Sequence, residues 1–322
     1  MSKTITHAEL FEATTRPDLA RYYRRGDPYD VRLGEMIVSD PTAYTNATVV
    51  MLGCPQDEGV QRNGGRVGAA QAPEAIRRAL TRMSVNGLRS MRIFDLGDTR
   101  IQATLEETHS LHQKIVQRII SDGKRLVVLG GGNDISYPDC AGVVAAIGPV
   151  LALNIDAHFD VRANTQHTSG TPYRLLLEEG ILRPSAFYEL GAQPYANSPV
   201  YASYLREKGV TVRTMEMLRE EGVRNAVAAL LASRSETSIF WGFDMDVVAA
   251  AFAPGVSAPN PTGMDANDFC RLFTLAGSDP RTRLVELCEV NPAFDHADLT
   301  CRLAAASVWH FLAAVALREG TL

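Results

Sequence analysis

The sequence predicts a doubly wound α/β domain built on a parallel β-sheet. Three observations support this fold class. Short apolar runs that end in polar clusters recur from about residue 46 to the C-terminus, helical patterns separate them, and no internal repeat or low-complexity linker divides the chain. Runs that are apolar on both faces are typical of central strands covered by helices. We therefore expect a single domain over residues 46–322, with residues 1–45 as an N-terminal extension packed on it.

Five runs are predicted to be strands of this sheet. They are TVVMLGCPQDEG from Thr48, RLVVLGGGND from Arg125, VLALNIDAHFD from Val150, SIFWGFDMD from Ser238 and RLVELCEVNP from Arg283. Helices are predicted between them. Residues 70–83 carry Pro73 near a helix start, and residues 105–120 have apolar side chains at three- and four-residue steps. The apolar stretch 303–317 is shorter than the roughly 20 residues that a membrane span needs, so we expect a buried helix.

Composition and charge argue against several classes of function. The chain has 322 residues, of which 46% are hydrophobic and 21% charged, with a net charge of −5. An acidic globular chain has no electrostatic reason to bind nucleic acid or an anionic membrane. Its five cysteines are irregularly spaced and form no disulfide framework or CxxC metal site, which favours reduced thiols. The N-terminal residues contain no apolar signal-peptide core, so we expect a cytoplasmic protein.

The polar clusters suggest a metal site. Ligands of open parallel sheets bind at the carboxyl ends of the strands, where all five clusters should meet. Asp156, His158 and Asp160 are spaced by two and would share one face of an extended strand. Asp244 and Asp246 repeat this spacing. Such oxygen and nitrogen ligands suit manganese better than a thiolate-type zinc site. The alternative is a strand that leaves the core and carries solvated aspartates.

Two adjacent cations, bridged by one aspartate, would have a specific use. They lower the pKa of a shared water molecule and stabilise a tetrahedral transition state. Two neighbouring carboxylates at the end of a buried strand repel each other unless a cation compensates their charge. The two clusters together therefore indicate a binuclear metallohydrolase more strongly than either alone.

Several segments together resemble the ureohydrolase family of arginase, agmatinase and formimidoylglutamase. These segments are GCPQDEGVQRNGGRVGAAQAPEAIR, GGGND, DAHFD, SGTP, FDMDVVAAAFAPGVSAPNPTGM and EVNP, and they span Thr48 to the C-terminus. The resemblance implies a three-layer αβα sandwich around a central, mostly parallel sheet, with two manganese ions. SGTPYR and VAAAFAPGVSAP make the chain most similar to formimidoylglutamase, which hydrolyses an amidine carbon–nitrogen bond.

The resemblance also implies roles for individual residues. The matching metal ligands are Asn133, Asp156, His158, Asp160, Asp244 and Asp246. Asp160 would also orient the attacking water, and Glu289 would pair with the planar cation of the substrate. The positions matching substrate contacts are Arg162, Ser169, Thr171 and Tyr173. Arg162 suits an acidic substrate, although a surface ion pair with a nearby aspartate is an alternative. Tyr173 falls where arginases place a proton-transfer histidine, and its pKa near 10 argues against arginase activity.

Two positions differ from the family pattern, and a third lies next to one of them. Asn133 stands where the family has a histidine ligand, and an amide oxygen is a weaker ligand than imidazole. Either Asn133 coordinates through its oxygen and one metal is held weakly, or that metal is lost and the site is mononuclear or inactive. Asp134 is interpreted as a helix N-cap rather than as an acceptor behind the metal site. Gly242 replaces a serine found in many members, and we attach no function to it.

The expected reaction converts N-formimidoyl-L-glutamate and water to L-glutamate and formamide, a step in histidine degradation. The alternatives are a guanidino-compound hydrolase, acting on agmatine, guanidinobutyrate or an arginine analogue, and a metal-poor, non-catalytic member of the family. The expected partner is a small amidine or guanidine substrate, with no nucleic acid or membrane, and the resemblance suggests a homo-oligomer.

Overall fold

The computed structural model describes residues 4–320, and within them the chain forms a nine-stranded sheet. The strand order is β1-β3-β2-β4-β9-β8-β5-β6-β7, and only β1 is antiparallel to its neighbour. The strands are β1 (Thr14–Thr15), β2 (Val49–Gly53), β3 (Ile93–Thr99), β4 (Arg125–Leu129), β5 (Leu151–Ile155), β6 (Phe187–Ala192), β7 (Thr211–Thr214), β8 (Ile239–Asp244) and β9 (Thr282–Cys288). The predicted fold class and all five predicted strands are confirmed.

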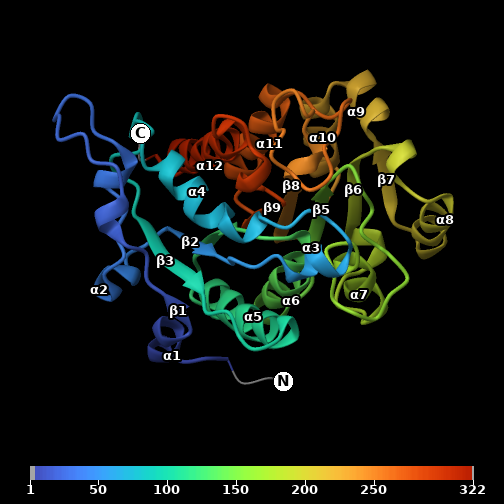
Figure 1. Ribbon diagram of the computed structural model, residues 1–322, viewed down its shortest axis with the longest axis horizontal. Helices are drawn as coiled ribbons and strands as arrows, with labels where there is room; N and C mark the ends of the chain where they lie inside the picture. Colours follow the sequence, from blue (N-terminus) through green and yellow to red (C-terminus); the bar gives the residue numbers. More distant parts are fainter. Residues whose placement is uncertain (1–3, 321–322) are drawn as a thin grey trace.

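Helices cover both faces of the sheet (Figure 1). They are α1 (His7–Glu12), α2 (Pro41–Tyr44), α3 (Glu58–Arg62), α4 (Ala72–Leu80), α5 (Leu105–Ser121), α6 (Ser136–Ile147), α7 (Pro172–Glu178), α8 (Pro199–Lys208), α9 (Met215–Glu221), α10 (Val223–Ala232), α11 (Ala266–Ser278) and α12 (Leu299–Arg318). Two hydrophobic cores lie on opposite sides of the sheet, one against α4 and α9–α12 and the other against α1 and α5–α8. The molecule therefore has the expected three layers.

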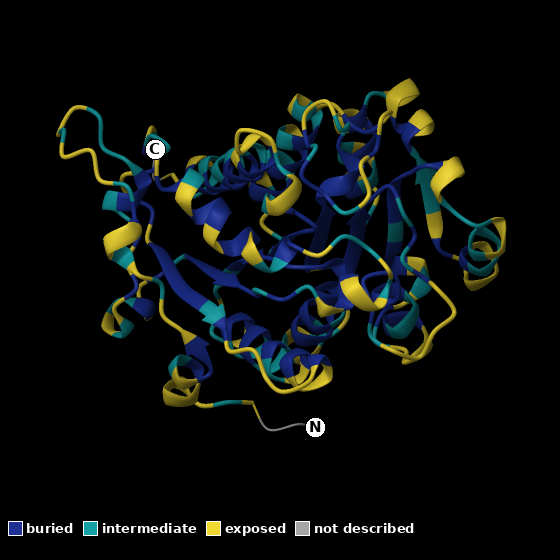
Figure 2. Cartoon of the chain, in the orientation of Figure 1, coloured by how far each residue is buried: buried dark blue, intermediate teal, exposed yellow. Residues whose placement is uncertain are grey.

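Strand residues alternate between these two cores. In β2, Val49 and Met51 face the core beneath α4 and α12, whereas Val50 and Leu52 face the core beneath α5 and α6. All four side chains are fully buried. The continuous apolar runs in the sequence are thus explained by burial on both faces. Figure 2 shows the central strands of the sheet as buried, whereas the edge strand β7 is partly exposed.

The predicted helices form, with ends that follow their local signals. Pro73 occupies the first turn of α4. Thr104 caps α5 by accepting a hydrogen bond from the backbone N–H of Glu107, whose side chain accepts one from the backbone N–H of Thr104.

The apolar C-terminal helix α12 is buried between α4 and α11, as predicted for residues 303–317. Among the described residues it is the one helix whose length and composition would suit a membrane span, and 61% of its most apolar window is buried inside the molecule. Such burial is typical of a core helix in a globular protein.

The N-terminal residues that the structure describes contact the sheet. Strand β1 extends its β3 edge, and Leu10 of α1 is fully buried in the core beside Phe94. Tyr22 lies further along the same segment and donates a hydrogen bond from its hydroxyl to the buried carboxylate of Asp95.

Candidate metal centre and substrate pocket

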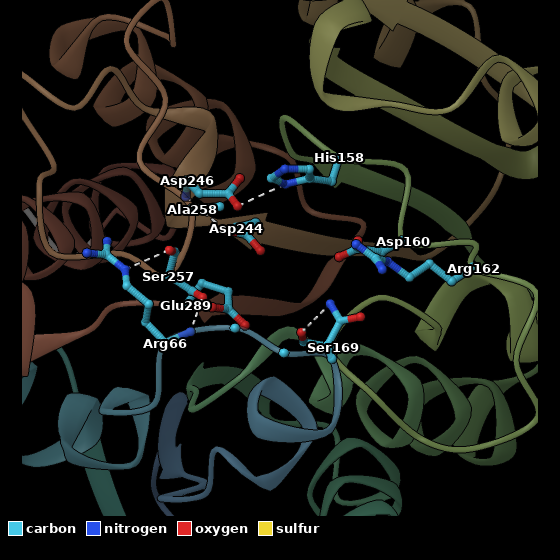
Figure 3. A pocket seen from close by; sticks show the side chains of 13 residues that line it. Arg66, His158, Asp160, Arg162, Ser169, Asp244, Asp246, Ser257, Ala258 and Glu289 are labelled. Atoms are coloured by element: carbon cyan, nitrogen blue, oxygen red, sulfur yellow. Dashed lines mark hydrogen bonds and ion pairs between the residues drawn. The ribbon is translucent and has the colours of Figure 1, made fainter.

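A cavity of about 290 Å³ opens where the central strands end (Figure 3). It is lined by Asn63, Gly64, Gly65, Arg66, His158, Asp160, Arg162, Ser169, Asp244, Asp246, Ser257, Ala258 and Glu289. These residues come from loops that follow β2, β5, β8 and β9, and from the turn before α7. The predicted convergence at the carboxyl end of the parallel sheet is therefore observed.

The residues Asp156, His158 and Asp160 meet through a turn rather than along an extended strand. Strand β5 ends at Ile155, and the carboxylate of Asp156 accepts a hydrogen bond of 2.7 Å from the backbone N–H of His158. Asp160 has a positive φ of 45°, a conformation that non-glycine residues rarely adopt. The predicted strand geometry is thus wrong, because the chain turns immediately after the last buried residue of β5.

A second turn brings Asp244 and Asp246 together. The carboxylate of Asp244, the last residue of β8, accepts a hydrogen bond of 2.8 Å from the backbone N–H of Asp246. Asp246 in turn lies 2.9 Å from His158, measured from its Oδ2 to the imidazole Nδ1. The two loops therefore contact each other at the floor of the cavity.

These side chains form two groups that could each hold a metal ion. In each group the ligand atoms lie within 4.8 Å of one another. One group contains Asp156, His158 and Asp246, and the other contains Asp156, Asp160 and Asp244. Since Asp156 belongs to both, the arrangement suits two adjacent cations bridged by this carboxylate.

The electrostatics of the cluster favour a cation. Burial and the neighbouring carboxylates hold the pKa of Asp156 and Asp244 well above the usual range. Burial and the carboxylate of Asp246 also raise the pKa of Asp160 to about 6, against the opposing effect of His158. The carboxylate of Asp246 raises the pKa of His158 to about 12. So many buried acids cannot all ionise without compensating positive charge, which divalent ions would supply.

Glu289 lies beside this cluster and shares a feature with Asp160. It follows β9 and has a positive φ of 60°. Its Oε1 accepts a hydrogen bond of 2.9 Å from the backbone N–H of Asn133. Strained backbone at two pocket carboxylates indicates that the surrounding structure fixes their orientation, as is common at functional sites.

Asn133 is fully buried at the start of a 3₁₀ turn (Asn133–Ile135) that follows β4. Its side-chain amide lies against the predicted ligands, with Nδ2 contacting the carboxylates of Asp160 and, at 3.3 Å, Asp156. Its Oδ1 faces the opposite way, toward Ser136. The structure thus places Asn133 next to the second acidic group, at the position expected for a ligand.

The opposite wall of the cavity carries hydrogen-bond donors. Arg162 is exposed, lies beside Asp160 in Figure 3, and forms no ion pair or side-chain hydrogen bond with the residues that the structure describes. Ser169 accepts a hydrogen bond of 3.0 Å from Asn63 Nδ2, which leaves its own hydroxyl free to donate. Gly170 makes room for the arginine, since a Cβ atom there would lie 2.7 Å from Arg162 Cδ.

Two predicted substrate contacts, Thr171 and Tyr173, lie outside the cavity lining. Thr171 is fully buried, and its hydroxyl donates to backbone carbonyls within its own turn. Tyr173 is also fully buried and stacks on Phe187, with ring centroids 4.9 Å apart. Its hydroxyl approaches Gly242, where an added Cβ would lie only 2.4 Å away. The absence of a side chain at Gly242 therefore makes room for Tyr173.

Asp134 is not the helix cap that the sequence suggested. It lies within the 3₁₀ turn, and α6 begins only at Ser136. Its carboxylate accepts hydrogen bonds of 2.7 Å from Gln56 Nε2 and from His109 Nε2. The expectation failed because the 3₁₀ turn delays the start of the helix, so that Asp134 is directed into buried space behind the site.

Sequence analysis missed six residues of the cavity lining, of which Asn63 and Arg66 carry polar side chains from the same loop. Both belong to the segment RNGGR, whose position directly after GCPQDEGVQ could have indicated them. Arg66 donates from Nε to the carbonyl of Ser257, at 2.9 Å, and its guanidinium lies 4.2 Å from the ring centroid of Phe294. Since its guanidinium also contacts the carbonyl of Val256, Arg66 fixes the loop that forms one end of the cavity.

Comparisons with known proteins agree with this geometry. The sequence profile of the Arginase family matches residues 47–314. The chain is 35% identical over 282 residues to the formimidoylglutamase of Geobacillus thermodenitrificans, covering 85% of this chain and 87% of that protein. It is 32% identical over 259 residues to the formimidoylglutamase of Bacillus subtilis, with 76% and 81% covered.

Solved structures show the same relationship. The Trypanosoma cruzi formiminoglutamase, crystallised with manganese, superposes with a TM-score of 0.85 at 32% identity and covers 90% of this chain and 99% of its own. The proclavaminate amidino hydrolase of Streptomyces clavuligerus, at 24% identity, has a TM-score of 0.75 and covers 84% of this chain and 93% of its own, which supports the fold alone. On its sequence, its fold and the extent of these matches, the chain belongs to the arginase family.

Proposed function

We propose that this enzyme hydrolyses N-formimidoyl-L-glutamate to L-glutamate and formamide. The observation that carries the proposal is the polarity of the cavity, which has a buried acidic cluster at its floor and the unpaired guanidinium of Arg162 on its wall. This substrate has the matching polarity, with a cationic amidine at one end and carboxylates at the other. The two relatives described above are formimidoylglutamases, which supports the same reaction.

The proposed cofactor is a pair of manganese ions. The residues that would hold them are Asn133, Asp156, His158, Asp160, Asp244 and Asp246. The fit is supported by the two groups of ligand atoms that share Asp156, and by the unfavourable burial of these acids without a cation. Bound manganese would supply Lewis acidity and make water a stronger acid at neutral pH. The T. cruzi relative was also crystallised with manganese.

Asp160 and Glu289 would act on the reacting groups. A free carboxylate oxygen of Asp160 would accept a hydrogen bond from the attacking water, and its strained backbone would hold that oxygen in position. Glu289 uses Oε1 to accept the backbone N–H of Asn133. Its Oε2 is then free to accept from the amidinium, whose planar N–H groups match a carboxylate. Asp160 would thus orient the water, whereas Glu289 would bind the cation.

Arg162, Ser169 and Asn63 would bind the carboxylate end. The guanidinium can form a bidentate pair with one carboxylate, while Ser169 Oγ donates a further hydrogen bond. A substrate with a cationic amine at this end, such as agmatine, would meet like charge. The donors on this wall thus favour an acidic amidine over a cationic guanidine.

The direct test is formamide release from N-formimidoyl-L-glutamate, measured with added manganese and again after chelation. We expect release that depends on manganese and returns when the metal is restored. Agmatine and 4-guanidinobutyrate are assayed in parallel for urea release. Faster turnover of either guanidino compound would replace the proposed substrate, and no turnover with any of the three would indicate a non-catalytic member of the family.

Arg162→Asn tests the specificity. We expect KM for N-formimidoyl-L-glutamate to rise at least tenfold with a smaller change in kcat, because the arginine binds a part of the substrate that does not react. Arg224→Asn is a matched control, since Arg224 is an exposed arginine on α10, away from the cavity lining. An unchanged KM in Arg162→Asn would remove this arginine from substrate recognition.

We also propose that the enzyme works in the cytoplasm as a homo-oligomer. All five cysteines are free, which suits a reducing compartment. The support for an oligomer is the family resemblance alone, and sedimentation of the purified protein would test it.

A further inference from the structure

The side chain of Asn133 presents a problem of orientation. An amide can coordinate a metal only through its oxygen, because the nitrogen has no free lone pair. In the structure Nδ2 lies toward the carboxylates of Asp156 and Asp160, and Oδ1 lies toward Ser136 Oγ at 2.7 Å and Cys288 Sγ at 3.2 Å. Coordination therefore requires the amide to rotate by half a turn, and the groups behind it determine whether the rotated form is stable.

Ser136 determines which orientation of the Asn133 amide is the more stable. Its hydroxyl has one proton but two acceptors in reach, Asn133 Oδ1 at 2.7 Å and Glu286 Oε1 at 2.5 Å. With Asn133 Oδ1 toward Ser136, these acceptors compete for that proton. After rotation there is no competition, because Asn133 Nδ2 donates to Ser136 and Ser136 donates to Glu286. The hydroxyl of Tyr173 lies near Ser136 and has no hydrogen-bond partner among the described residues, so it can then donate to the remaining lone pair of Ser136 Oγ.

A buried chain of hydrogen bonds fixes the direction in which Ser136 donates. Thr99 Oγ1 lies 2.6 Å from His112 Nδ1, and His112 Nε2 lies 2.9 Å from Asp139 Oδ1. His112 is fully buried and its pKa is lowered to about 3 by burial, so it is neutral. A neutral imidazole that accepts from the threonine hydroxyl must donate to Asp139.

The next step in the chain is a pair of carboxyl groups. Asp139 and Glu286 are both fully buried and close enough to share a hydrogen bond, and Asp139 Oδ2 and Glu286 Oε2 have no protein donor among residues 4–320. One shared proton, held on Glu286 and donated to Asp139, satisfies both atoms. Glu286 Oε1 is then an acceptor for Ser136. The reverse direction would need a second proton in this buried pair.

We propose that Ser136, supported by Glu286, is a positioning residue that holds the Asn133 amide with its oxygen toward the metal ions. Two runs of donors, one from Thr99 through His112 and the other from Asn133 through Ser136 and Glu286, then converge on Asp139. This arrangement would let an asparagine act at the position where the family resemblance places an imidazole ligand. The inference rests on the metal site of the proposed function.

The test compares Ser136→Ala in two backgrounds by titrating metal-free protein with manganese alone. In the native background we expect the dissociation constant of the more weakly held ion to rise about tenfold, the usual effect of removing a group that orients a ligand. In the Asn133→Asp background we expect a change of less than about threefold. A carboxylate is isosteric with the amide but presents an oxygen in either rotation.

Two further variants make the test specific. Ser307→Ala removes another fully buried serine, located on α12, and should leave manganese affinity unchanged. Glu286→Gln should also bind manganese normally, because a glutamine can accept from Ser136 and donate to Asp139 as the protonated acid does. This second variant remains informative if Ser136→Ala fails to fold.

The outcomes separate the two proposals. Equal weakening by Ser136→Ala in both backgrounds, or none in either, would overturn the positioning role, as would a large loss of affinity in Glu286→Gln. Failure of the native protein to bind manganese would instead overturn the metal site of the proposed function. Because binding is measured without substrate, an error in the assigned substrate would affect neither result.

Discussion

The buried position of Tyr173 is predicted to require glycine at position 242. An added Cβ at this position would lie 2.4 Å from the tyrosine hydroxyl oxygen, far inside van der Waals contact. The tyrosine cannot retreat easily, because its ring is fully buried and stacked on Phe187. We therefore expect Gly242→Ser to destabilise the protein by about 1–3 kcal/mol, the usual cost of overpacking a core.

Thermal unfolding of the metal-free protein measures this cost. At about 2–3 °C per kcal/mol for a chain of this size, the midpoint should fall by about 2–9 °C. Tyr173→Phe removes the clashing oxygen, so the double variant should regain at least half of the loss. The coupling between the two changes should exceed about 0.5 kcal/mol. Additive effects, or an unchanged midpoint in Gly242→Ser, would refute the steric argument.

Three further predictions concern the metal centre. Asp244→Asn should abolish measurable manganese binding by calorimetry while raising the unfolding midpoint of the metal-free protein, because it removes one of several mutually repelling buried acids. Asp160, whose pKa in the folded protein is raised to about 6, should stabilise the metal-free protein below about pH 4. This contribution, up to about 3 kcal/mol, should be lost as the pH rises through about 6. Urea unfolding of Asp160→Asn across this range should therefore show a flatter dependence of the unfolding free energy on pH. Manganese at about one hundred times its dissociation constant should add about 2.7 kcal/mol of stability at neutral pH, reversed by chelation, and an equal midpoint with and without metal would contradict binding to the folded state.

Much of the fold could be predicted because its signals are local. Five strands were recognisable as short apolar runs, and helices α4 and α5 by their periodicity and first-turn residues. Strands β1, β3, β6 and β7 were not among the predicted runs. Strand β3 contains Asp95 and Asp98 within IFDLGDT, which breaks the apolar pattern. Arg77 compensates both charges in the folded protein, and a contact of this kind is not visible in a local pattern.

The candidate site was predictable in position but not in detail. The polar clusters DAHFD and FDMD indicated where ligands should converge, since strand ends share one edge of a parallel sheet. The turn that brings Asp156 to Asp160 depends on a backbone hydrogen bond and a positive φ, neither of which has a clear sequence signal. Tyr173 was assigned to the pocket by its motif, whereas its depth is determined by Phe187 and Gly242, which are distant in sequence.

The strand order has a consequence for synthesis of the chain. Strand β9, the last to leave the ribosome, lies between β4 and β8 at the centre of the sheet. Until Thr282–Cys288 is available, the chain can form only two half-sheets, β1-β3-β2-β4 and β8-β5-β6-β7, each with an unpaired hydrophobic edge. Open parallel edges of this kind invite aggregation. A chain that stops before Thr282 would thus be a substrate for chaperones or proteases. Because Glu289 directly follows β9, the pocket is also completed only when this strand closes the sheet.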